Sequence, residues 1–73
     1  MMIEVFKTNI AKKREARLIL KQLLNMLPGA AVNFDLEDCD RILRIESRRQ
    51  NFEPRQVCDV VAKMGFECRV LND

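Results

Sequence analysis

The stretch AVNFDLEDCDRILRIE, residues 31–46, decides which fold the chain can adopt. Apolar and polar residues alternate over residues 31–37 and again over residues 41–46, where Leu43 and Ile45 are expected to point inward. Residues 37–40 separate the two runs with three carboxylates and one cysteine, and they predict a turn. The stretch therefore predicts a β-hairpin with one apolar face.

The segment before this hairpin, residues 11–27, predicts an amphipathic helix. Its apolar residues recur at helical spacing and form a single stripe. Thr8 or Asn9 is expected to cap its start, because both side chains accept hydrogen bonds from free helix amides. Pro28 and Gly29 follow the segment and end the helix. The stripe consists of Ala16, Ile19, Leu20, Leu23 and Leu27.

The segment after the hairpin predicts a second helix and a last strand. A polar connection at residues 48–53 leads to Pro54, which suits the first turn of a helix running to about Met64. Gly65 ends this helix, and residues 67–71 predict the last strand. The buried stripe of the second helix consists of Val57, Val60, Val61 and Met64.

The first strand is predicted at residues 2–9, and its pattern leaves open whether Ile3 and Val5 or Phe6 and Thr8 face the core. The order of elements is therefore β-α-β-β-α-β, in which each βαβ crossover should be right-handed. We predict one α+β domain spanning all 73 residues, with a four-stranded antiparallel sheet and both helices on one face. The other face of the sheet is open to water or to a partner.

The composition narrows the class of protein. A net charge of +2 is too small to indicate a nucleic-acid partner by itself. No apolar run approaches the ~18–20 residues that a membrane helix needs, and the N-terminus shows no secretory signal. Three cysteines without close spacing are not a disulfide framework, and free thiols favour a reducing compartment. We therefore expect a cytoplasmic protein without a membrane span.

Four segments of the chain stand in the order and spacing that heavy-metal-associated domains show. They are Leu27-Pro28-Gly29, the run from Val32 to Glu37, Glu53-Pro54, and the run from Lys63 to Glu67. Over nearly its whole length the chain resembles this family, to which copper chaperones and the N-terminal domains of metal-pumping ATPases belong. The resemblance implies a ferredoxin-like βαββαβ fold.

The family binds a soft metal ion through a Met-x-Cys-x-x-Cys loop before the first helix, where two thiolates converge on one ion. Counted back from Leu27, the Met position falls on about Ala11 and the thiol positions fall on about Lys13 and Ala16. The chain has no cysteine before Cys39, so these ligands are not carried over. The resemblance therefore implies a diverged member without the usual thiolate site.

The remaining candidate for metal binding is Cys39, with Asp38 and Asp40 beside it as oxygen ligands for copper or zinc. In this fold the turn that carries Cys39 should lie at the same end as the loop near residues 8–12 and the loop near residues 64–66. The other two thiols, Cys58 and Cys68, are expected to be structural, with Cys68 facing inward.

The start of the first helix is strongly basic. A helix N-terminus combines free amides with a positive dipole end, and cationic side chains there favour an anionic partner. Arg48 and Arg49 should lie at the opposite end of the domain. Leu18 and Leu24 fall outside the buried stripe and suggest a docking or dimer surface. The cations are Lys12, Lys13, Arg14 and Arg17.

No group of residues predicts an active site, since the chain has no histidine, no glycine-rich phosphate loop and no nucleophile with a base at suitable spacing. We expect no enzymatic activity and no cofactor. The main hypothesis is a non-catalytic interaction module whose partner is another protein or a second copy as a homodimer. One alternative is a diverged copper- or zinc-binding protein. The other is a nucleic-acid binder, which the lack of Tyr and Trp on the strands disfavours.

Overall fold

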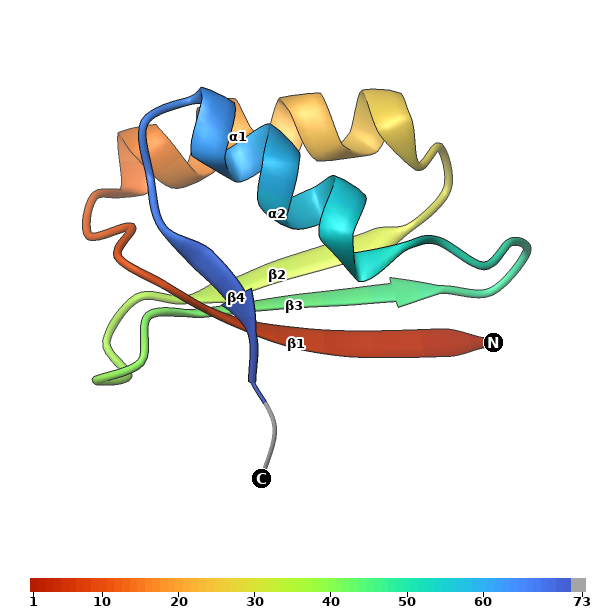
Figure 1. The fold of residues 1–73 in the computed structure, drawn as a ribbon, viewed down its shortest axis with the longest axis horizontal. Helices are drawn as coiled ribbons and strands as arrows, with labels where there is room; N and C mark the ends of the chain where they lie inside the picture. The colour runs from red at the N-terminus through yellow and green to blue at the C-terminus, as the bar shows by residue number, and fades with distance from the viewer. Residues whose placement is uncertain (72–73) are drawn as a thin grey trace.

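In the computed structural model, which describes residues 1–71, two helices lie on one face of a four-stranded sheet (Figure 1). The order across the sheet is β2-β3-β1-β4, and every neighbouring pair is antiparallel. This arrangement confirms the predicted ferredoxin-like α+β fold. The elements are β1 (Met2–Thr8), α1 (Lys13–Met26), β2 (Ala31–Asp35), β3 (Ile42–Ser47), α2 (Pro54–Lys63) and β4 (Cys68–Val70).

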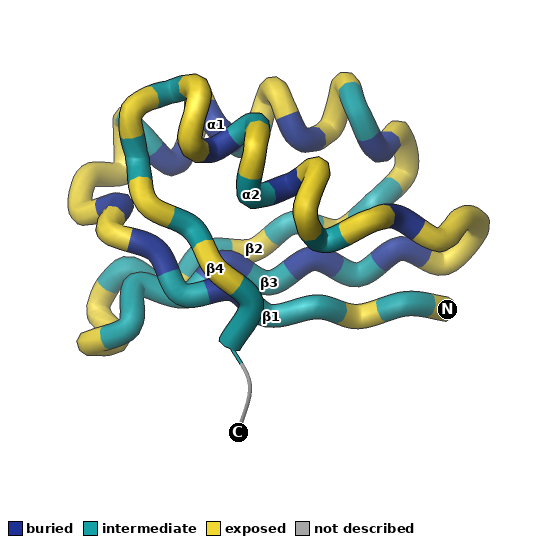
Figure 2. The backbone as a smooth tube through the Cα atoms, viewed as in Figure 1, coloured by how far each residue is buried: buried dark blue, intermediate teal, exposed yellow. Residues whose placement is uncertain are grey.

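The strand register decides which face of β1 is covered. Phe6 pairs with Leu43 and Thr8 pairs with Cys68, so these residues share the face that the helices cover. Ile3 lies on the open face and is 41% exposed. Figure 2 shows the buried positions of strands and helices facing each other across the interior. The core consists of Phe6, Ile10, Ala16, Ile19, Leu23, Leu27, Leu43, Ile45, Phe52, Val57 and Val61.

The connecting loops contribute to this core more than their composition indicates. Ile10 is fully buried, and Phe52 is only 6% exposed although it lies in the segment predicted to be a polar connection. The backbone N–H of Phe52 contacts the Met2 sulfur at 3.3 Å, and the Ser47 hydroxyl donates to the Gln50 carbonyl at 2.6 Å. A single apolar residue in a loop has no periodicity, so the sequence pattern could not place Phe52.

The predicted cap of α1 is wrong. The helix starts at Lys13, two residues later than predicted, with Lys12 at the N-cap position and the Glu15 carboxylate accepting the Lys12 N–H at 3.2 Å. The Thr8 hydroxyl instead donates to the Arg41 carbonyl at 2.6 Å, and the Asn9 side-chain oxygen accepts the Glu67 N–H at 2.8 Å. These tertiary bonds use the two side chains that could have capped the helix.

The other element boundaries lie within two residues of the predicted ones. Strand β3 starts at Ile42 because Arg41 has a φ of 46°, in the left-handed region that a strand cannot contain. Strand β2 stops at Asp35 because the chain enters the tight turn that leads to Arg41. Helices α1 and α2 have 14 and 10 residues, and within residues 1–71 neither is long and apolar enough to cross a bilayer.

Candidate functional site

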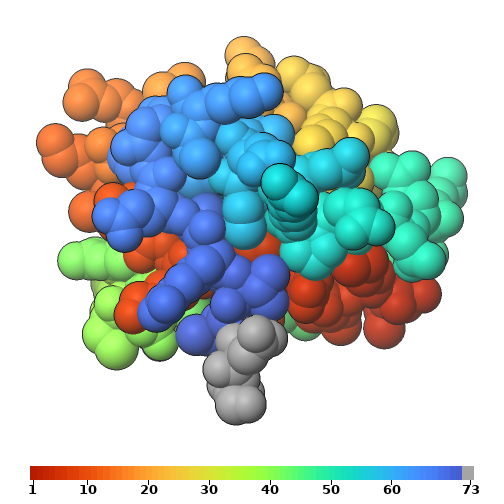
Figure 3. All heavy atoms as spheres, viewed as in Figure 1, coloured from red at the N-terminus to blue at the C-terminus, as the bar shows by residue number. Residues whose placement is uncertain are grey.

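One end of the domain gathers three connections that are far apart in sequence. The Thr8 N–H donates to the Asp40 carbonyl at 3.1 Å, which joins the loop before α1 to the β2–β3 turn. The Glu67 N–H donates to Asn9, which joins the same loop to the α2–β4 connection. Figure 3 shows the start of α1 (orange) and the β2–β3 turn (green) at this end, as predicted. Ser47 pairs with Met2, so Arg48 follows β3 at the opposite end.

The predicted cations of α1 are all exposed at this end, and their charges are not neutralised locally. Within residues 1–71, the salt bridges involve none of Lys12, Lys13, Arg14 and Arg17. The Glu15 carboxylate already accepts one of the first amides of the region, at Lys12.

A groove of about 410 Å³ separates α1 from β2. Lys13 and Arg17 line its helix side, so two of the four predicted cations belong to it and the other two do not. Asp35 and Glu37 line its strand side and carry the opposite charge. Between these walls lies an apolar floor, so the groove can take an apolar side chain and an acidic one side by side. The floor is made of Ala16, Leu20, Phe34 and Leu36.

Strand β2, beside this groove, is an edge of the sheet and pairs only with β3. Its five residues contain no Lys, Arg or Pro, which are the residues that usually keep edge strands from pairing. Its inner-face residues Val32 and Phe34 are half-buried.

The two leucines of α1 that were predicted to lie outside the buried stripe are exposed. Leu24 is 38% exposed, and Leu18 is 56% exposed.

The candidate metal ligands come together in the β2–β3 turn. One ligand atom from each of Asp38, Cys39 and Asp40 lies within 4.8 Å of the others. The carboxylates already have partners, because Asp38 accepts the Asp40 N–H at 2.8 Å and Asp40 lies 3.3 Å from the Lys7 ammonium. A cation at this turn would compete with Lys7 for Asp40, and metal binding here stays a prediction.

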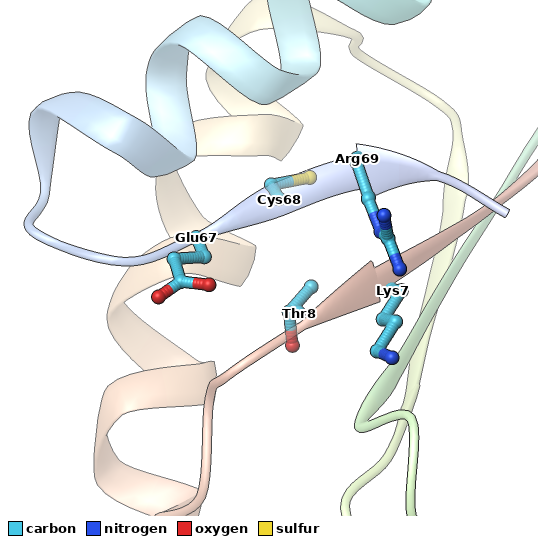
Figure 4. A pocket seen from close by; sticks show the side chains of 5 residues that line it. All are labelled: Lys7, Thr8, Glu67, Cys68 and Arg69. Carbon is cyan, nitrogen blue, oxygen red and sulfur yellow. The ribbon is translucent and has the colours of Figure 1, made fainter.

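A second pocket, of about 470 Å³, lies where β1 meets β4 (Figure 4). Lys7 and Arg69 are directly opposite each other in the antiparallel pair, and Figure 4 shows the Arg69 side chain running toward Lys7. Like charges in this position repel each other unless an anion lies nearby. The Asp40 carboxylate is the anion beside Lys7, at 3.3 Å from its ammonium group. Glu67 lies at the other side of the pocket from Arg69. Sequence reasoning missed the pair because only the strand register brings the two cations together.

The open face of the sheet is charged and aliphatic. Arg44 lies opposite Val5, and Glu46 lies opposite Ile3 and within 3.6 Å of Arg44. The four phenylalanines lie elsewhere, in the core or packed against it. Over the described residues this face therefore presents no aromatic ring on which a base could stack. The nucleic-acid alternative receives no support from it.

The structure also brings together two thiols that the sequence did not associate. Cys58 of α2 and Cys68 of β4 are both half-buried against the core, on two elements that pack together. Burial raises the pKa of the Cys68 thiol far above its ordinary value, and the neighbouring Cys58 raises it further. Cys68 faces inward as predicted, and the structural role predicted for both cysteines stays a prediction.

Comparison with models of known families, with curated proteins and with solved structures finds no match to the chain. The arrangement of charges, apolar surface and free strand edge is therefore the basis on which a function is argued.

Proposed function

We propose that the chain is a non-catalytic interaction module that binds an extended, acidic and apolar segment of another protein along the α1–β2 groove. The observation that carries this proposal is the position of the groove beside the free edge of β2. A partner there can use backbone and side-chain contacts at once. A reducing, cytoplasmic setting is part of the proposal, because all three cysteines are free thiols.

The free edge favours an extended partner over a helical one. The backbone groups of β2 that point away from β3 have no strand beside them, and an added strand would accept and donate the missing ladder bonds. Alternate side chains of that strand would then point into the helix layer, next to Phe34 and Leu20. Apolar side chains at these positions would fill the floor of the groove.

The charges of the groove set the chemistry of the partner. Lys13 and Arg17 stand on the helix wall, within reach of the inward side chains of an added strand, and favour acidic ones. Asp35 and Glu37 border the strand side of the groove and favour a basic residue beside them. The expected partner segment therefore carries acidic and apolar residues on its inward face, with a basic residue near Asp35.

The proposed site replaces the metal loop of the family that the chain resembles. Lys13 falls at about the first thiol position of that loop, where it lines the groove instead of coordinating an ion. Lysine is cationic at neutral pH, so it repels a metal ion and attracts a carboxylate. We infer that a diverged heavy-metal-associated domain has retained the fold and now uses this end for a protein.

The test is a selection of displayed random peptides on the immobilised domain, followed by titration of a selected peptide into the labelled protein by NMR. We expect acidic and apolar peptides that shift the amides of β2 and of the first turns of α1. Replacing Lys13→Gln together with Arg17→Gln should weaken binding about tenfold.

The matched control is Arg49→Gln with Arg55→Gln, which removes the same charge from exposed positions away from the groove and should leave binding unchanged. Equal weakening of binding by the two double substitutions would show that only the net charge of the domain matters, and it would overturn the proposed site. Peptide shifts confined to the open sheet face would overturn it too. The groove could instead bind a second copy of the chain. Light scattering of the free protein measures its mass, and a dimer that pairs through β2 would show that the second copy is the occupant.

A further inference from the structure

Two thiols from different elements face each other at the β4 edge. Cys68 shares the inner face of the sheet with Thr8, its cross-strand partner, and α2 packs against β4 from that side. Cys58 belongs to α2, packs against the core as Cys68 does, and lies close enough to Cys68 to raise the pKa of its thiol. Both residues are half-buried rather than enclosed, so a small reagent can reach the pair from the side of the sheet. The third thiol, Cys39, is exposed in the β2–β3 turn.

One member of the pair, Cys68, lines the pocket drawn in Figure 4, together with two cations, Lys7 and Arg69, and one carboxylate, Glu67. Glutathione carries two carboxylates and one ammonium group, so its charges match those of the pocket walls. Lys7 and Arg69 alternate with Thr8 and Cys68 along the strands and so belong to the open face, whereas the Cys68 side chain belongs to the inner face. A glutathione joined to the pair therefore reaches the cations only around the edge strand β4.

We propose that Cys58 and Cys68 form a modification site, at which oxidised glutathione converts the two thiols into a disulfide that ties α2 to β4. The site lies at the opposite edge of the sheet from the α1–β2 groove, so the proposal goes beyond the proposed function and does not depend on it. Reduced glutathione reverses the reaction.

The reaction is a pair of thiol–disulfide exchanges. The Cys58 thiolate attacks one sulfur of oxidised glutathione, the glutathione S–S bond breaks, and one glutathione leaves as a thiolate that takes up a proton. The Cys68 thiolate then attacks the Cys58 sulfur and expels the second glutathione in the same way. Two protein thiols lose two electrons and two protons, and one oxidised glutathione becomes two reduced molecules.

The environment of Cys68 sets the order of these steps. Its raised pKa makes it the poorer first nucleophile, because the thiolate is the attacking form. Two of the causes of that raised pKa come from Cys58 itself. Both disappear once Cys58 carries glutathione, which leaves burial alone to oppose the second step.

The experiment treats the fully reduced protein with oxidised glutathione under native conditions and measures the intact mass after alkylation of the remaining thiols. Cys39 has no partner thiol in the structure, so it serves as an internal standard that retains glutathione. We expect one retained glutathione per chain, no alkylated thiol, and a peptide that links Cys58 to Cys68. At this pair the closed form should exceed the mixed disulfide by roughly tenfold.

Two variants complete the test. Cys39→Ser should retain no glutathione and remain monomeric while the linked peptide persists. Cys68→Ser should retain two glutathiones, because the mixed disulfide at Cys58 has no thiol to resolve it. The proposal is overturned if the unmodified sequence accumulates two or three glutathiones without the linked peptide. It is also overturned if Cys58 and Cys68 both remain free to alkylate.

Discussion

The two edges of the sheet differ in length, charge and covering. Strand β2 is five residues long, with Val32 and Phe34 toward the helices and Ala31, Asn33 and Asp35 exposed. Strand β4 is three residues long, with the exposed Arg69 at its centre. The groove beside β2 has an apolar floor between charged walls, whereas the pocket beside β4 is lined mostly by charged and polar residues.

This difference separates the two uses that we propose for the edges of the sheet. A short strand with a central arginine is a poor template for a second strand, and this protects β4 from pairing. Strand β2 lacks both safeguards and is free to pair with a partner. The β4 edge instead combines two thiols with a charged pocket, which suits a small reagent rather than a protein.

The sharpest test of this difference truncates one inner-face residue at each edge. Phe34→Ala should lower the free energy of unfolding by about 2 to 3 kcal/mol, because a large half-buried ring is removed from the floor of the groove. Val70→Ala on β4 should cost about 1 kcal/mol, since fewer methyl groups are lost. Urea unfolding measures both values. Equal costs would mean that β4 contributes as much to the core as β2 does.

Closing the disulfide should strengthen the β4 edge alone. A covalent loop from Cys58 to Cys68 spans eleven residues of the sequence and should raise the free energy of unfolding by about 2 kcal/mol through its effect on the unfolded chain. The measurement compares urea unfolding of the oxidised and reduced forms of Cys39→Ser, and the reduced form is the control because it has the same sequence. A loss of stability on oxidation would show that the native geometry does not accommodate the bond.

The pH dependence of stability should also report on the β4 edge. The folded pKa of Cys68 lies above the ordinary thiol value of 9.0, so the folded state holds the proton more tightly than the unfolded state. Stability from this group is full below pH 9 and declines as pH rises above it. The slope cannot exceed the ~1.4 kcal/mol per pH unit that one titrating group gives, and we expect a smaller value because solvent screens a half-buried thiol and reduces its pKa shift.

Urea unfolding at pH 7.5 and at about pH 10 measures this decline. Cys68→Ala should remove most of it, whereas Cys39→Ala, which truncates an exposed thiol, should leave it in place. An identical decline in all three proteins would assign the pH dependence to groups other than Cys68.

The smallest effect on stability is expected for Asn33→Lys at the exposed outer face of β2. The change should alter the free energy of unfolding by less than about 0.5 kcal/mol, with a small cost from Arg44 opposite. It should still weaken peptide binding, because a lysine on an edge strand opposes the addition of another strand. Arg69→Lys on β4 is the matched control and should not affect binding. Undiminished binding by Asn33→Lys would show that the peptide does not pair with β2.

The sequence pattern predicted the helices, the strands and most of their buried positions, because these features depend on local periodicity. The hairpin at residues 31–46 and the stripe of α1 were recognisable because strands repeat every two residues and helices every 3.6. Leu43 and Ile45 were placed correctly on the buried face for the same reason. The pattern failed at Phe52 and Ile10, since an apolar residue in a loop is placed by the shape of the core it closes.

The candidate sites were predictable only in part. Lys13 and Arg17 stood out as cations at a helix start, but their apolar neighbours Phe34 and Leu36 come from another element and join them only in the folded chain. The capping role given to Thr8 and Asn9 was wrong, because both side chains bond to segments that approach from far along the sequence. Rules for helix caps consider only neighbours along the sequence, so they cannot predict that a distant backbone group will bind the same side chain.

The sequence by itself determined the number, kind and order of the elements, and with them the ferredoxin-like sheet. It did so because propensity, periodicity and turn residues act within a few positions along the chain. The tertiary structure alone decided the meeting of Cys58 with Cys68 and of Lys7 with Arg69. These contacts depend on how strands pair and helices pack, so residues without any pattern in common become neighbours only when the chain is folded.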